Sequence, residues 1–297
     1  MRTRGLVGAA LSLALLVGCS PATANPPVSA TAPSPAGSGL HIVAGFYPLA
    51  YVAQAVTGDN AHVTSLAAPG VEPHDVELSP SAVRDIGAAA LVLYIQDFQP
   101  SVDDAVGTTG VEALDAATVI ELRHTATGTD PHFWLDPMLL ADYGHDLATD
   151  LGRLDPAHAD EYRGNAKRLY AELSELDSAF TEGLAQCGRH DIVTSHESLA
   201  YLAARYGLTQ VAIAGLDPEN EPSPKRVREI TQSVRDTGAT TIFTESSNST
   251  SIVDTIADDA GVQTAVLSPV ETVGDGEDYF SVMYGNLATL RKALDCD

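Results

Sequence analysis

From Leu40 onward, short apolar runs rich in β-branched residues alternate with stretches of helical periodicity. Strands of this kind, separated by helices, are typical of parallel sheets whose two faces are both covered. The sequence therefore predicts an α/β fold. The predicted strands lie at residues 41–46, 62–66, 90–95 and 118–122 in the first half, and at residues 191–195, 210–213, 240–244 and 264–267 in the second half.

The two halves share a pattern that starts a helix. Ser79-Pro80 and Ser223-Pro224 each place a serine at the N-cap position and a proline at the first helical position, and a Val-Arg-acid-Ile run follows in both halves. A serine cap satisfies a free backbone N–H group, and proline preorganises the first turn. We therefore expect two pseudo-symmetric parallel-sheet lobes, residues 40–154 and residues 186–297.

Residues 155–185, between the two predicted lobes, have the pattern of one long helix. Asp155-Pro156 is a helix-start signal, and apolar residues such as Leu169 and Leu173 follow at helical spacing with no further proline. A helix of about 28 residues would reach about 42 Å at a rise of about 1.5 Å per residue. This backbone helix would run along both lobes and limit hinge motion between them.

Residues 1–19 resemble the signal peptide of a bacterial lipoprotein. Arg2 and Arg4 precede an apolar run that is too short to span a bilayer as a mature helix, and small residues stand directly before Cys19. We expect cleavage before Cys19 and lipidation of its thiol, which would anchor the protein to the membrane outside the cytoplasm. An ordinary secretory signal with a chance cysteine is the alternative.

The segment that follows, residues 20–39, is dense in Pro, Ala, Ser and Thr and contains no charged residue. This composition predicts a flexible or partly polyproline tether that holds the folded part away from the membrane. No other apolar run approaches the length of a membrane span. The predicted membrane attachment therefore depends on the lipid.

Cys187 and Cys296 remain if Cys19 is lipidated. An even number of cysteines in an oxidising compartment favours one disulfide, which would tie the start of the second lobe to the C-terminus. Two reduced cysteines are the alternative. A zinc thiolate site is disfavoured, because neither cysteine has a second one at C-x-x-C spacing.

The charge balance narrows the range of partners. The chain has 40 acidic residues against 16 Lys and Arg, a formal net charge of −24. Such a chain repels phosphate backbones, so we expect no nucleic-acid partner. The same charge would gather cations at the surface, although solubility alone also explains it.

Three histidines, His74, His132 and His196, follow predicted strands. The loops beyond the carboxyl ends of parallel strands form the binding crevice of α/β sheets. We therefore expect two imidazoles from the first lobe and one from the second to converge between the lobes, where neutral imidazoles would suit Zn²⁺. The remaining histidines are interpreted as structural or surface residues: His41, His62, His124, His145, His158 and His190.

The fourth metal ligand has several candidates. Glu245 follows the predicted strand 240–244 in the same lobe as His196, so its carboxylate is the predicted fourth ligand. The same carboxylate could instead cap the next helix or accept a hydrogen bond from a ligand imidazole. In that case Glu72 or a water molecule would complete the ligand set.

Several motifs together resemble the zinc/manganese solute-binding lipoproteins of ABC transporters, over about residues 40–290. The resemblance implies two α/β lobes joined by one backbone helix, with the metal between them and an ABC permease as partner. It also implies that His74, His132 and His196 are metal ligands. The motifs that carry it lie at residues 70–80, 130–137, 195–198 and 215–223.

Two departures from the family pattern concern the metal. The family usually has Asp in the loop after the last strand, where this chain has Ser268, a poor ligand; a long His-rich acidic loop before the second ligand is also missing. Manganese-type members commonly have Glu at the position of His196, so three imidazoles favour Zn²⁺, with Mn²⁺ as the alternative. The three histidines and the resemblance together imply a zinc-binding protein, expected to be a monomer, that delivers metal to an ABC importer.

Two further functions compete with this one. The first is an extracytoplasmic zinc hydrolase, because three protein ligands plus water form a catalytic geometry. No His-Glu-x-x-His motif is present, since Ala200 stands four residues after His196, so we expect no enzyme. The second is cell adhesion, a function with which relatives in the family have been labelled, but no repeat array or separate ligand domain supports it here.

Overall fold

The computed structural model describes residues 39–125, 128–218, 222–245 and 251–297. Gly39–Asp297 is one compact unit. The predicted signal peptide, Cys19 and nearly all of the predicted tether lie outside the described residues. Within the described part, none of the helices is both long and apolar enough to cross a bilayer.

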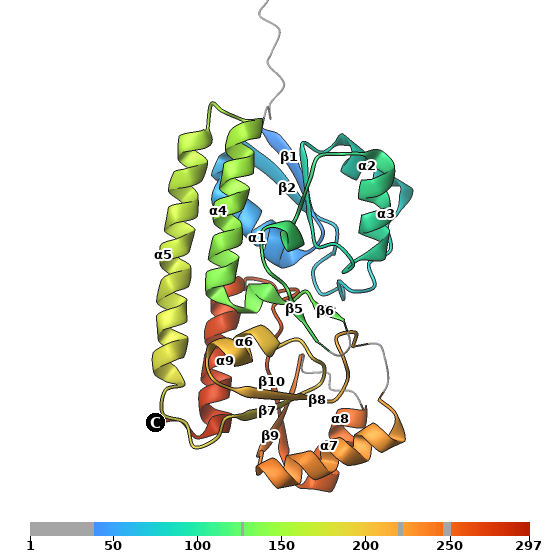
Figure 1. The fold of residues 1–297 in the computed structure, drawn as a ribbon, viewed down its shortest axis with the longest axis vertical. Coiled ribbons are helices and arrows are strands. Elements are labelled where there is room, and N and C mark those ends of the chain that lie inside the picture. Colours follow the sequence, from blue (N-terminus) through green and yellow to red (C-terminus); the bar gives the residue numbers. More distant parts are fainter. Residues whose placement is uncertain (1–38, 126–127, 219–221, 246–250) are drawn as a thin grey trace, which may run out of the picture. The chain divides into compact units, whose positions relative to one another are not determined.

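The first lobe, in the upper half of Figure 1, contains a parallel four-stranded sheet in the order β2-β1-β3-β4. Side chains alternate between its two faces: Ile42 and Ala44 belong to the main core, whereas Val43 packs in a second cluster with Ile86 and Ala105 from the helices on the opposite face. Both faces are therefore covered, as the apolar runs predicted. The elements are β1 (Leu40–Ala44), α1 (Tyr47–Thr57), β2 (Ala61–Ser65), α2 (Pro80–Ala88), β3 (Leu91–Tyr94), α3 (Pro100–Thr109) and β4 (Ala113–Asp115).

The second lobe repeats this topology, with a parallel sheet in the order β10-β9-β7-β8. In both sheets the first strand in the sequence lies between the second and the third, and the fourth is at the edge. The predicted fold class, two pseudo-symmetric parallel-sheet lobes, is confirmed. The elements are β7 (Asp191–Thr194), α6 (Ala200–Arg205), β8 (Thr209–Ala212), α7 (Pro224–Thr237), β9 (Thr241–Thr244), α8 (Ser251–Ala260), β10 (Gln263–Val266) and α9 (Tyr279–Leu294).

The predicted helix starts are also confirmed. The Ser79 side chain accepts a hydrogen bond from the Ala82 N–H at the start of α2, and the Ser223 side chain accepts one from the Arg226 N–H at the start of α7. Both helices have proline in the first turn. The same local chemistry thus starts equivalent helices in the two lobes.

The strand predicted at residues 118–122 is wrong. The fourth strand, β4, lies earlier and ends at Asp115, whose carboxylate accepts a hydrogen bond from the Ala117 N–H at 2.9 Å and starts a 3-10 turn, Ala116–Thr118. The N–H groups of Val119 and Ile120 then donate to the carbonyl of Ala116. These apolar residues therefore extend a turn and pack inward without pairing with the sheet.

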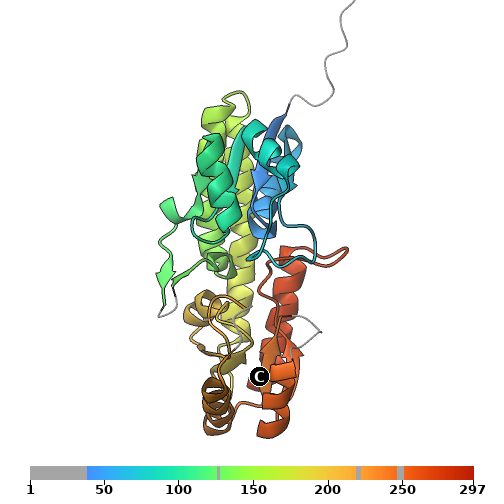
Figure 2. The ribbon, with the colours of Figure 1, turned by 90° about the vertical axis from the view of Figure 1, so that its right-hand side faces the viewer.

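The connecting helix, α5 (Ala159–Gly183), begins four residues later than predicted. Asp155 does not cap it: Asp155 ends the preceding helix, α4 (Pro137–Leu154), and its carboxylate lies 2.6 Å from His158 Nδ1 and accepts from the Tyr162 hydroxyl at 2.8 Å. With 25 residues, α5 reaches about 37 Å. It packs against α4 and α1 of the first lobe and α9 of the second (Figures 1 and 2).

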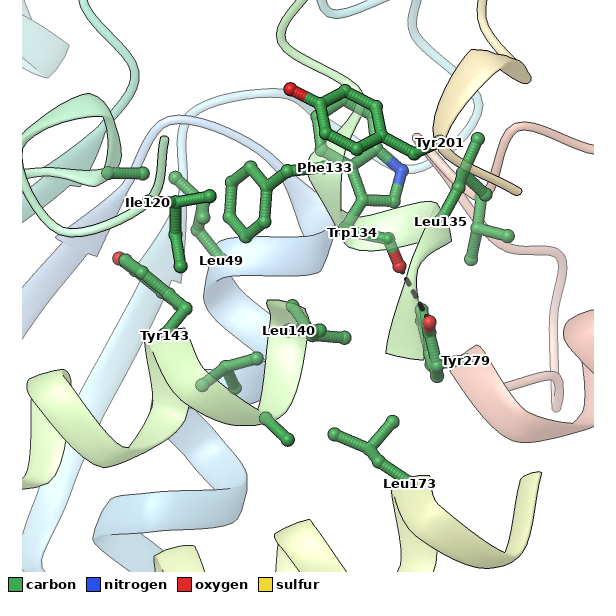
Figure 3. Packing of buried hydrophobic residues seen from close by; sticks show 14 of the residues in the cluster. Leu49, Ile120, Phe133, Trp134, Leu135, Leu140, Tyr143, Leu173, Tyr201 and Tyr279 are labelled. Atoms are coloured by element: carbon green, nitrogen blue, oxygen red, sulfur yellow. Dashed lines mark hydrogen bonds between the residues drawn. The ribbon is translucent and has the colours of Figure 1, made fainter. Parts of the chain in front are cut away.

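A shared hydrophobic core joins the two lobes. Trp134 is fully buried, and its indole Nε1 donates to the carbonyl of Pro269 at 2.7 Å. The Tyr279 hydroxyl in turn donates to the Trp134 carbonyl at 2.6 Å (Figure 3). Because Trp134 precedes α4 whereas Pro269 and Tyr279 follow β10, these contacts fix the second lobe's last loop against the first lobe.

A disulfide connects Cys187, just after α5, with Cys296, just after α9. These are the two cysteines that the cysteine count suggested as a pair. Backbone hydrogen bonds run beside the disulfide, from the Gly188 N–H to the Asp295 carbonyl at 3.0 Å and from the Asp297 N–H to the Gln186 carbonyl at 3.1 Å. The C-terminus is therefore fixed to the start of the second lobe.

Candidate metal centre

The structure brings His74, His132 and His196 together with Glu271. One potential ligand atom from each lies within 4.8 Å of those of the others. The three imidazole centroids are 5.4 to 6.0 Å apart. The side chains of His132, His196 and Glu271 are 0, 1 and 3% exposed, and that of His74 is 11% exposed. The predicted convergence of histidines from both halves is therefore present in the structure.

Each lobe contributes two of these side chains. His74 lies between β2 and α2, and His196 comes just after β7. His132 follows a short antiparallel hairpin, β5 (Arg123–His124) and β6 (Thr129–Asp130), and precedes a 3-10 turn, Phe133–Leu135, that leads into α4. Glu271 lies in the loop between β10 and α9. The four side chains thus meet between the two sheets.

Glu245, the predicted fourth ligand, lies behind His196. Its Oε1 makes a short contact with His196 Nδ1 and accepts a hydrogen bond from the Ser195 hydroxyl at 2.8 Å. The carboxylate that lies with the three histidines in the four-residue group is that of Glu271, whereas the sequence predicted Glu245 there. The physical reason is local: Glu245 directly follows β9, the strand that pairs with β7, so its carboxylate is within reach of the outer nitrogen of His196.

Glu72 is a neighbour of the same cluster. It forms a second close group of carboxylates with Glu245 and Glu271. Its Oε1 accepts a hydrogen bond from the His74 backbone N–H at 3.2 Å and lies 3.9 Å from His74 Nε2. Burial and the negative charge of Glu271 raise the pKa of Glu72 to about 7.

His132 is held on both ring nitrogens by carboxylates. Its Nδ1 lies 2.7 Å from Asp130 Oδ1, which also accepts from the His132 backbone N–H at 3.0 Å, and its Nε2 lies 3.1 Å from Glu271 Oε1. Burial acts to lower the pKa of His132, but the hydrogen bonds to Asp130 and Glu271 outweigh it and raise the pKa to about 9. In Glu271, burial acts to raise the pKa, but the interactions with His132 and His74 hold it well below its usual range.

Two ring nitrogens in the cluster are buried without a well-formed hydrogen bond, His74 Nε2, which lies 3.4 Å from Glu271 Oε1, and His196 Nε2. Leaving a buried polar atom unpaired is unfavourable, so each such atom requires an explanation. A carboxylate on His196 Nδ1 fixes the proton there and leaves the Nε2 lone pair free, which is the arrangement of a metal-ligating histidine. Three imidazole nitrogens and one carboxylate fit the tetrahedral ligand set of Zn²⁺.

The sequence interpretation missed Glu271 and the role of Asp130. Asp130 precedes His132 by two residues, and that short spacing across Pro131 was the available signal. Glu271 follows Ser268, the position of the expected acid, by three residues. The Ser268 hydroxyl accepts a hydrogen bond from the Val270 N–H at 3.1 Å, within its own loop.

The fold and the side-chain cluster together define the class of this protein. It is a two-lobed α/β protein with a candidate metal centre, three histidines and a carboxylate, between its two parallel sheets. The chain belongs to the family described as zinc-uptake complex component A, periplasmic (ZnuA), whose model matches residues 42–293. This membership agrees with the family that the motifs resemble.

Individual relatives are about one-third identical to the chain over the aligned residues. The zinc-binding lipoprotein AdcA of Streptococcus pneumoniae is 33% identical in a 280-residue alignment that covers 86% of this chain and 56% of AdcA, so the chain spans little more than half of that relative. The Zn(II)-bound ZnuA-like domain of the same AdcA has a TM-score of 0.76 and 34% identity, covering 86% of this chain and 99% of that structure. The laminin-binding protein Lmb of Streptococcus agalactiae, described as having adhesin and metal-transporting activity, has a TM-score of 0.80 and 31% identity, covering 86% of this chain and 100% of that structure.

Proposed function

We propose that this protein binds one Zn²⁺ ion through His74, His132, His196 and Glu271 and delivers it to an ABC importer. The observation that carries the proposal is the group of four donors from both lobes, two of whose buried ring nitrogens have no well-formed hydrogen bond. Family membership and the zinc-binding relatives named above support it. In this proposal Glu271 replaces Glu245 as the fourth ligand.

The proposed location is the outer side of the cell membrane. Cys19 would be lipidated and residues 20–39 would form the tether, so that a monomeric metal-binding domain stays close to the permease. The protein would act as a binding protein and not as an enzyme. A catalytic zinc site keeps one position open for water, whereas here Glu271 is buried beside the three histidines and can fill the fourth position.

A zinc titration of the chelator-treated protein tests the proposal. We expect one Zn²⁺ per chain bound more tightly than micromolar, and Mn²⁺ bound at least about tenfold more weakly, because imidazole nitrogens suit Zn²⁺ better than Mn²⁺. Competition with a chromophoric chelator would give both affinities. Zinc binding weaker than micromolar would contradict the proposed function, whereas equal affinities would contradict only the choice of metal.

A further inference from the structure

Gln99 is a buried glutamine at the start of α3 whose side chain does not cap that helix. It is the N-cap residue of α3 and only 1% exposed, yet its side chain makes no capping hydrogen bond. Glutamine is not among the preferred N-cap residues. Instead, its amide Nε2 donates to the carbonyl of Pro73 at 2.9 Å and to that of Gly45 at 3.3 Å.

The Pro73 carbonyl belongs to the peptide group that joins Pro73 to His74. A hydrogen bond to this carbonyl fixes the orientation of that peptide and hence the backbone from which the His74 side chain starts. The adjacent Phe98 ring packs edge to face against the His74 imidazole at 4.6 Å between centroids. Gly45 leaves the required room, since a Cβ atom there would lie 2.4 Å from Gln99 Oε1.

Gln210 holds the backbone at a histidine of the second lobe. Its Nε2 donates to the carbonyl of His196 at 3.0 Å and to the hydroxyl of Thr194 at 2.8 Å. That hydroxyl itself donates to the same His196 carbonyl at 2.7 Å. The backbone at His196 is thus held from β8 by Gln210 and from β7 by Thr194.

The two glutamines share a second feature: Oε1 of Gln99 and Oε1 of Gln210 are both buried without a hydrogen-bond partner. The amide orientation is constrained, because the carbonyl oxygens of Pro73 and His196 can only accept hydrogen bonds and therefore face Nε2 rather than Oε1. An unpaired buried oxygen destabilises the fold. Each lobe retains one such glutamine, and in both cases its amide N–H group bonds to the backbone at or beside a histidine of the metal cluster.

We infer that Gln99 and Gln210 are positioning residues that hold the backbones of His74 and His196 in place for the metal. The inference rests on the proposed zinc site. Asp130 and Glu245 contact the imidazole rings of His132 and His196. The two glutamines add a second kind of support, because they bond to the main chain at His74 and His196. Support of this kind keeps ligands in their binding geometry before the ion arrives.

Gln99→Met and Gln210→Met test the inference, because methionine has a similar length and no N–H donor. We expect each variant to bind zinc about tenfold more weakly than the wild type, and the double variant about a hundredfold more weakly if the two effects are independent. The absorption bands of the Co²⁺-substituted protein, which report coordination geometry, should also change in each variant. Gly45→Ala, which displaces the Gln99 amide without removing it, should give the same kind of change.

Asn165→Leu is the matched control. Asn165 is also a buried amide, 6% exposed, and its Nδ2 donates to the Val56 carbonyl at 2.8 Å, which is not next to a metal ligand. This variant should unfold more readily but keep the wild-type zinc affinity and Co²⁺ spectrum.

Wild-type affinity and an unchanged Co²⁺ spectrum in the Gln99 and Gln210 variants would overturn the inference while leaving the proposed function intact. An equal loss of affinity in Asn165→Leu would also overturn it, since the effect would then be one of general stability. Failure of the wild type to bind zinc would instead contradict the proposed function.

Discussion

The His132→Ala variant is expected to bind zinc at least about a hundredfold more weakly than the wild type. Replacing a residue that hydrogen-bonds to a metal ligand weakens metal binding by up to about a hundredfold, and loss of the ligand itself should weaken it at least as much. His132 is the central member of the cluster: it is 0% exposed, and carboxylates lie at 2.7 and 3.1 Å from its two ring nitrogens. Its loss would leave the ion with two imidazoles and one carboxylate from the proposed set. Competition titration of the variant with a chromophoric chelator would measure the loss.

His145→Ala is the control for this prediction. His145 is an exposed residue on α4, and it belongs to none of the groups of potential metal ligands among the described residues. Its replacement should leave zinc affinity unchanged. If His132→Ala retained the wild-type affinity, the ligand assignment would be wrong, even if the protein bound zinc elsewhere.

Removal of the disulfide is expected to lower the free energy of unfolding by about 2–4 kcal/mol. The disulfide joins residues 109 positions apart, so it closes a long loop and strongly restricts the unfolded chain. Its loss would also free the C-terminus from the start of the second lobe. The measurement is chemical denaturation of the Cys187→Ser/Cys296→Ser variant beside the wild type.

Zinc binding provides the internal control for the disulfide prediction. Cys187 precedes β7, whereas His196 follows the carboxyl end of the same strand, so the disulfide and the candidate metal centre lie at opposite ends of β7. The zinc affinity of the folded variant should therefore stay close to that of the wild type. An unchanged denaturation midpoint would show that backbone pairing at the C-terminus suffices without the disulfide.

The fold was predictable where local chemistry decides it. Ser79-Pro80 and Ser223-Pro224 start helices because cap and proline act within one turn. The apolar run at residues 118–122 was not predictable as a turn. Its conformation depends on the Asp115 carboxylate, which accepts hydrogen bonds from the N–H groups of Ala117 and Gln96. The Asp115 carboxylate thus combines a contact within the turn with one to Gln96, which is 19 residues away in the sequence.

The proposed site was predictable from the sequence except for its proposed fourth donor, Glu271. His74, His132 and His196 are marked by their positions after predicted strands and by the family motifs. Glu245 and Glu271 both follow strands of the same sheet, β9 and β10, so strand ends alone do not distinguish them.

What separates the two glutamates is tertiary. The loop after β10 turns at Val270, with φ of 58°, and the side chain of Asn286 on α9 bonds to both the N–H and the carbonyl of Ser268, at 2.9 and 2.7 Å. These contacts, together with the bond from Trp134 to Pro269, direct Glu271 toward the histidines. None of them is visible in the local sequence.

A crystal structure of the zinc-bound protein, with anomalous diffraction recorded on both sides of the zinc absorption edge, tests the proposed ligand set most directly. The predicted result is one zinc peak between the lobes, bonded to nitrogens of His74, His132 and His196 and to an oxygen of Glu271, with Glu245 still on His196 Nδ1. A zinc ion bonded to Glu245 in place of Glu271, or no zinc peak at the three histidines, would contradict the proposed site.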